Sequence, residues 1–359
     1  MNYILRIIKR IAGAMFRVPA YSLSPSGNPE GDKPACRKTS VGGQALIEGL
    51  LMIGPKKVAI AIRKPDREID LQIKPLSPKT PMQKILFLRG AVNLFKQMKI
   101  GVSALMYSAQ YMEIEEDEED KEETGEVESS KFERFLEDKF GDKAKDIIIY
   151  IAVILALFFT VGLFILLPNF VAGFIPLDKS RRGGLILLNL CEGCIRVGIF
   201  LAYLAISSRL QEINRLWQYH GAEHKTINCY EHGDPLQTEY IRKYSVKHPR
   251  CGTSFLFLVM IISILVFSLV DLAAFGLRFE LTGVLRILFS LLIRLVTIPL
   301  VAGAAYEVIR LSGNFDNALT RAVSAPGMLF QRFTTREPDD EMLEVAIVAF
   351  ENALSEDEP

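Results

Sequence analysis

Long apolar stretches dominate the second half of the chain. They cover residues 147–167, 184–208, 254–276 and 283–306. At about 1.5 Å per helical residue, each is long enough to cross a bilayer whose hydrocarbon core is about 30 Å thick. The pattern predicts a mainly α protein, a polytopic membrane protein with about four transmembrane helices.

Shorter patterns predict elements outside these stretches. Residues 57–62 and 68–74 alternate partly between apolar and polar side chains around a Lys-Pro-Asp-Arg turn, which indicates a small β-hairpin on the cytoplasmic side. Residues 81–112 have a helical pattern with several basic residues, which is typical of amphipathic helices on a membrane or against a helix bundle. Residues 326–338 are expected to form a loop, and residues 339–354 a helix with one apolar face.

Changes in composition divide the chain into five parts. Both termini are expected to be cytoplasmic in a multi-pass protein of the inner (cytoplasmic) membrane, because Lys and Arg concentrate in the segments that four crossings place on one side. The parts are an N-terminal arm and linker (1–40), a cytoplasmic hairpin with amphipathic helices (41–112), an acidic run expected to be disordered (113–131), a four-helix membrane bundle (147–306) with a cytoplasmic loop (209–253), and a cytoplasmic C-terminal region (307–359).

Charge and cysteine usage narrow the function classes. The 42 basic and 42 acidic residues balance, and no basic stripe interleaved with aromatic residues is present, so we expect membrane lipids and not nucleic acids as partners. The five cysteines are an odd number, which argues against a disulfide framework. Cys191 and Cys194 form a C-x-x-C pair, but inside an apolar stretch, where they more often pack as small hydrophobes.

The candidate chemistry lies in the loop 209–253. All four histidines of the chain fall between His220 and His248. His220 and His224 are four residues apart, so on a helix both imidazoles face one side, where a zinc-type ion needs them. Glu223 completes the order H-x-x-E-H, in which the glutamate activates water as general base and does not bind the metal. The alternative is that both histidines belong to the packed face of an amphipathic helix.

The four crossings also select candidates for the third metal ligand. His248 and Cys251 stand directly before the third apolar stretch, and Glu307 follows the fourth, so all three are expected at the same cytoplasmic surface. We rank them in the order Glu307, His248, Cys251. The alternative for Glu307 is a salt bridge with Arg310, one helical turn away.

Several blocks of the chain resemble the YqhQ-like family of bacterial membrane proteins. The blocks are GGQALIEG (42–49), YHGAEHK (219–225), HPRCGT (248–253), YE (306–307), TTREP (334–338) and LEVAI (343–347). The family is a domain of unknown function, and the resemblance implies a metal-dependent enzyme. It assigns no role to the Cys191–Cys194 pair.

Two function classes follow. The first is a membrane-embedded metal-dependent enzyme, a hydrolase that holds a divalent ion such as zinc and acts on a protein or a lipid-linked substrate at the cytoplasmic interface. The second is a non-catalytic assembly or scaffold protein, in which a closed metal site pins the loop to the bundle. A transporter is less favoured, because no internal repeat is present.

Overall fold

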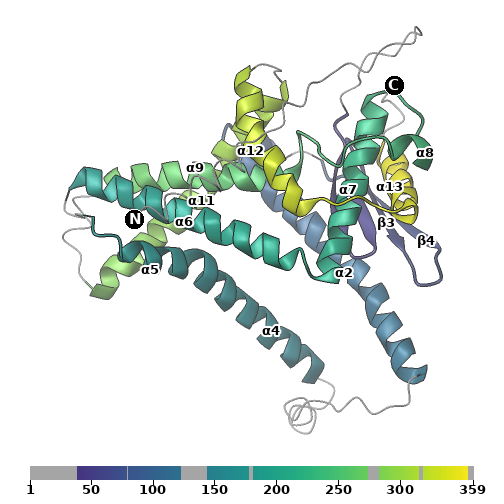
Figure 1. Cartoon of the computed structure of the whole chain (residues 1–359), viewed down its shortest axis with the longest axis horizontal. Helices are drawn as coiled ribbons and strands as arrows, with labels where there is room; N and C mark the ends of the chain where they lie inside the picture. The colour runs from purple at the N-terminus through teal and green to yellow at the C-terminus, as the bar shows by residue number, and fades with distance from the viewer. Residues whose placement is uncertain are drawn as a thin grey trace, which may run out of the picture. The chain divides into compact units, whose positions relative to one another are not determined.

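A computed structural model of the chain describes residues 39–78, 80–122, 144–177, 181–273, 283–314 and 318–354 (Figure 1). The expected N-terminal arm, apart from its last two residues, and the second half of the acidic run lie outside the described residues. The described residues all belong to one compact unit, Arg37–Pro359.

A four-stranded antiparallel sheet forms the first part of the described chain. Its strands are β1 (Gly42–Leu46), β2 (Gly49–Ile53), β3 (Lys57–Arg63) and β4 (Ile69–Pro75), paired in sequence order. The expected hairpin is confirmed as β3 and β4, which pair from Lys57 opposite Pro75 to Arg63 opposite Ile69. β1 and β2, which the sequence pattern does not predict, extend the hairpin into a sheet.

Helices make up most of the remaining described chain. In chain order they are η1 (Pro81–Lys84), α2 (Leu88–Glu122), α4 (Ala144–Val161), the π-helical turn η3 (Gly162–Leu166), α5 (Leu167–Gly173), α6 (Arg182–Ser207), α7 (Gln211–Glu231), α8 (Thr238–Ile241), α9 (Gly252–Ala273), α11 (Gly283–Asn314), α12 (Ala318–Thr334) and α13 (Asp340–Ala353).

The sheet is covered on both faces. Leu50 and Met52 of β2 pack in one cluster with residues of α7 and α13, the two helices on that face (Figure 1). Leu51 of β2 and Ile60 of β3 point the other way, into a cluster with Ala104 of α2. Because both faces are buried at β2, its sequence Gly-Leu-Leu-Met-Ile is a nearly continuous apolar run, which hides the two-residue period of a strand.

Two described segments are long and apolar enough to cross a membrane, and little of either is buried within the protein. They are Ile154–Gly173, in α4 to α5, and Gly183–Ser207, in α6. The third and fourth expected crossings correspond to α9 and α11, in which the apolar segments are the shorter Leu256–Val270 and Leu295–Val308.

Some boundaries differ from the expected ones. Helix α12 continues through Pro326 to Thr334, so the loop expected over residues 326–338 was wrong for residues 326–334 and is confirmed for residues 335–338. The reason is packing: Phe330 is buried and stacks on Phe200 of α6, which outweighs the local Pro-Gly signal. Helix α2 extends into the acidic run as far as Glu122.

The expected C-terminal helix is confirmed as α13. Asp339 caps it by accepting a hydrogen bond from the Met342 amide at 2.9 Å.

Candidate metal centre

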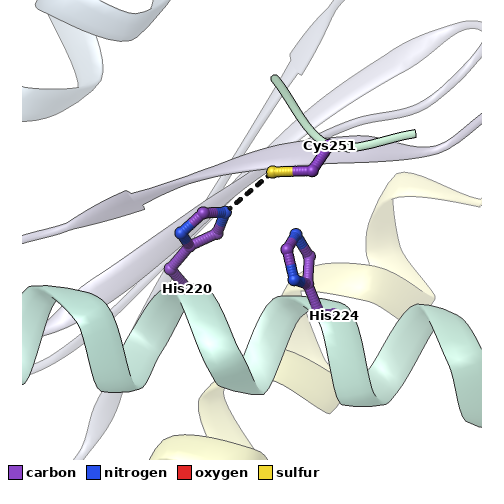
Figure 2. Close-up of side chains that lie close together, drawn as sticks. All are labelled: His220, His224 and Cys251. Atoms are coloured by element: carbon purple, nitrogen blue, oxygen red, sulfur yellow. Dashed lines mark hydrogen bonds between the residues drawn. The ribbon is translucent and has the colours of Figure 1, made fainter. Parts of the chain in front are cut away.

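Helix α7 presents two histidines side by side, and Cys251 lies over both rings (Figure 2). The centroids of the His220 and His224 rings are 4.4 Å apart. The ligand atoms of His220, His224 and Cys251 all lie within 4.8 Å of one another, and all three residues are buried. The four-residue spacing on α7 supplies the pair, and the chain returns 27 residues later to supply the sulfur.

Backbone carbonyls orient both imidazoles. Nδ1 of His220 donates to the Thr334 carbonyl and Nδ1 of His224 donates to the Val246 carbonyl, each at 2.6 Å. A carbonyl oxygen only accepts, so the proton of each ring is on Nδ1 and the lone pair is on Nε2. This is the arrangement by which proteins hold histidine ligands, with Nε2 left for the metal.

Cys251 is delivered by the segment that precedes α9. The Gln331 side chain of α12 holds this segment, since its Oε1 accepts from the His248 amide at 2.9 Å and its Nε2 donates to the His248 carbonyl at 2.7 Å. Three residues later, Sγ of Cys251 lies 3.1 Å from Nε2 of His220. Because Nε2 carries the lone pair, the thiol is the donor, and its proton occupies the space between the two candidate ligand atoms.

Burial governs the electrostatics of the centre. It lowers the pKa of His224, against the nearby Cys251 sulfur, which raises it. Burial likewise raises the pKa of Glu223, against the charges of His220 and His248 and the hydrogen bond from the Gly43 amide, which lower it. His224 is therefore held in the neutral form that binds metals.

The three side chains fit a tetrahedral divalent ion. Zinc–nitrogen and zinc–sulfur bonds of about 2.0 and 2.3 Å place two ligand atoms about 3.5 Å apart. The observed separations range from 3.1 Å to at most 4.8 Å, so the side chains need to move by about 1 Å or less to reach that geometry. Within the described residues, Nε2 of His224 has no hydrogen-bond partner, as expected of an atom that serves as a ligand.

Glu223 stands beside this group with one oxygen engaged. Its Oε1 accepts from the Gly43 amide of β1 at 2.8 Å, and its Oε2 is buried without a hydrogen-bond partner among the described residues. Gly43 has to be a glycine for this approach, because a Cβ there would lie 3.0 Å from the Glu223 carboxyl carbon and closer still to β2.

His248 lies next to the group without being part of it. Its ring centroid is 5.8 Å from that of His224, and its Nε2 is 3.6 Å from Glu231, beyond hydrogen-bond distance. Glu231 is itself held by Arg250 and by the Thr39 amide.

Glu307, ranked first as third ligand, has both oxygens bound to the Arg89 guanidinium of α2, with Nε to Oε1 at 2.6 Å. The metal-capable group among the described residues contains Cys251 in its place. The alternative predicted for Glu307 was also an ion pair, but with Arg310 and not with Arg89.

Four residues that help to build this centre are not indicated by the sequence pattern. The Thr334 and Val246 carbonyls act through the backbone, so no side-chain signal marks them. Gln331 lies in a segment expected to be a loop, and Gly43 lies in a strand that the pattern did not predict. The one available signal was that Gly43 and Thr334 fall inside the motif blocks that resemble a known family.

Comparison with known proteins agrees with those blocks. The family described as "Protein of unknown function (DUF1385)" matches residues 85–356. The chain belongs to this family. It is similar to the "Uncharacterized protein YqhQ" of Bacillus subtilis (strain 168), with 31% identity over 317 residues, which cover 87% of this chain and 92% of the relative. The DUF1385 match contains His220, Glu223, His224 and Cys251 and begins after the last strand of the sheet. No solved structure matches the chain.

Proposed function

We propose that this protein is a metal-dependent hydrolase at the cytoplasmic surface of the membrane, with His220, His224 and Cys251 as ligands of a zinc-type ion. The observation that supports this most is the convergence of three buried ligand atoms in which both imidazoles are aligned by backbone carbonyls. A core histidine needs a partner for its polar atoms, but it does not need a second histidine and a thiol at metal-ligand distance.

Three protein ligands leave a fourth position open, which is the pattern of catalytic zinc sites. When bound, zinc would lower the pKa of a coordinated water, so that the hydroxide needed to attack a carbonyl or phosphoryl group would form near neutral pH. Glu223 is the proposed general base. Its Oε1 is anchored on β1, while its buried Oε2 has no described partner and is available to accept a proton.

The proposal includes a four-crossing architecture in which α9 and α11 join the two membrane-length segments. Helix α6 ends at Ser207 and α7 begins at Gln211, so the histidine helix follows directly from an apolar helix. Cys251 immediately precedes α9. The centre therefore lies where two apolar helices end, which favours a peptide or lipid-linked substrate presented at the cytoplasmic interface.

Metal analysis of the purified full chain tests the ligand set. We expect close to one equivalent of metal in the wild type and a loss of most of it in His220→Ala, His224→Ala and Cys251→Ser. His232→Ala and Cys229→Ser are matched controls, because His232 is exposed near the end of α7 and the buried Cys229 hydrogen-bonds Pro235. Equal metal in all five variants would refute the site.

Glu223→Gln separates catalysis from metal binding. The amide keeps the size of the side chain but removes a base, so turnover of a reporter peptide or ester should fall at least about a hundredfold while bound metal stays within about 20% of wild type. Unchanged turnover would eliminate Glu223 as base.

A structural metal site is the second candidate, and the position of His248 favours it. The ring is buried, its Nε2 makes no described hydrogen bond, and it lies beside His224. If His248 closes the coordination sphere, His248→Ala should lower the metal content and the stability together, and Glu223→Gln should change neither. The hydrolase proposal expects His248→Ala to retain the metal.

A further inference from the structure

A second site lies away from the metal centre, between the sheet and α2. A pocket of about 260 Å³ is lined by Lys74 of β4 and by Lys96 and Lys99 of α2. Its apolar wall includes Val58, Ile60 and Ile100, which belong to the cluster under this face of the sheet. No Asp or Glu is among the described residues that line it, so the pocket combines three positive charges with an apolar wall.

Lys96 and Lys99 border an exposed apolar stripe on α2. Phe95, Met98, Val102 and Met106 follow a helical spacing of three and four residues, and each side chain is more than half exposed. Lys96 and Lys99 stand between this stripe and the residues that pack on the sheet. Apolar side chains facing outward beside snorkelling lysines are typical of a helix that lies in a membrane interface.

Helix α2 is fixed to an apolar helix close to these residues. Gly90 packs so tightly on α11 that a Cβ there would lie 2.6 Å from Tyr306 Cβ and 2.9 Å from Gly303 Cα. Both contacts lie in the apolar segment Leu295–Val308. Lys96 and Lys99 follow six and nine residues after Gly90, or about 9 and 14 Å along the helix. The pocket is therefore close to the end of that apolar segment.

We propose that this pocket binds one anionic phospholipid of the cytoplasmic leaflet, with the phosphate between Lys74, Lys96 and Lys99. Lys96 donates to the Ser77 carbonyl at 2.5 Å and, as an ammonium, has two further hydrogens for a phosphate. The apolar wall takes the first carbons of the acyl chains, and the stripe from Phe95 to Met106 lies among the neighbouring chains. The site does not depend on the metal centre.

The test counts lipids retained by the full chain, purified in mild detergent, by native mass spectrometry. Three probes are added separately: a phosphatidylglycerol, a phosphatidylcholine with the same acyl chains, and inorganic phosphate. The pocket variant is Lys74→Gln/Lys99→Gln, two exposed lysines. The matched control is Lys84→Gln/Lys243→Gln, which removes two exposed charges outside the pocket.

We expect one tightly retained phosphatidylglycerol per chain and much weaker retention of phosphatidylcholine. Each lysine near an anionic headgroup contributes roughly a factor of five, so the pocket variant should bind about 25-fold more weakly while the control stays within about twofold of wild type. Equal loss in both variants would assign the effect to overall charge, and equal retention of phosphatidylcholine would exclude headgroup recognition. Displacement by millimolar phosphate would mean a free-anion site. Each of these results overturns the proposal.

Discussion

Replacing Gln331 tests how the fold delivers the sulfur ligand. The Gln331 side chain is completely buried and makes two hydrogen bonds to the backbone of His248, three residues before Cys251. Gln331→Met keeps most of the volume but removes both the acceptor and the donor. The His248 amide and carbonyl would then be buried without partners, because His248 is only 4% exposed.

The expected cost follows from those two groups. Each buried polar group without its partner costs about 1–3 kcal/mol, so Gln331→Met should lower the free energy of unfolding by roughly 2–6 kcal/mol. The segment carrying Cys251 also loses its anchor. Removing the groups that orient a metal ligand typically weakens metal binding by about 10- to 100-fold.

Two measurements check this prediction. Denaturation in mild detergent gives the difference in free energy of unfolding between the wild type and the variant, both free of metal. Competition with a chelator of known affinity gives the change in zinc Kd. Gln211→Met is the control, because Gln211 is exposed at the start of α7. A decrease in the free energy of unfolding below about 0.5 kcal/mol, with an unchanged zinc Kd, would refute the proposed role of Gln331 in holding the Cys251 segment.

Three further predictions concern the surroundings of the centre. Glu307→Gln should weaken the packing of α2 on α11 through the Arg89 pair and leave the metal content unchanged; loss of metal would restore Glu307 as a ligand. Gly43→Ala should lower the free energy of unfolding, measured by denaturation, by about 1–3 kcal/mol, because the added Cβ would collide with β2. Gly42→Ala should leave it unchanged, because an added Cβ there has no atom within 4 Å, and equal effects of the two substitutions would contradict the collision. Because burial lowers the pKa of His224 below its usual 6.5, the unfolded chain binds the proton more readily. In the metal-free protein, the contribution of neutral His224 to the free energy of unfolding should therefore be fully present above about pH 6.5 and decrease as the pH falls below that value. This decrease should be smaller in His224→Gln, and parallel pH profiles of the two proteins would contradict the prediction.

The local spacing of residues in the sequence was sufficient to predict the histidine pair, one hairpin and the start of the last helix. A four-residue interval on a helix places two side chains on one face whatever the rest of the chain does, so the His220–His224 pair is set by the sequence alone. The same holds for the hairpin of β3 and β4, which has a turn sequence between two short runs, and for the capped start of α13 at Asp339.

The other features, namely strands β1 and β2 and the third residue of the metal centre, depend on contacts between segments that are distant in the sequence. β2 is buried along almost its whole length and β1 is the short run Gly-Gly-Gln-Ala-Leu, so neither sequence carries an alternation from which a strand can be recognised. Glu307 and Cys251 were both expected at the same surface, and the order between them could not be read from chain position. Arg89, 218 residues earlier in the chain, binds the carboxylate of Glu307. Gln331 of α12 instead holds the segment that carries Cys251 next to the two histidines. Which side chains converge depends on how helices pack, and packing is a property of the whole core and not of any one segment.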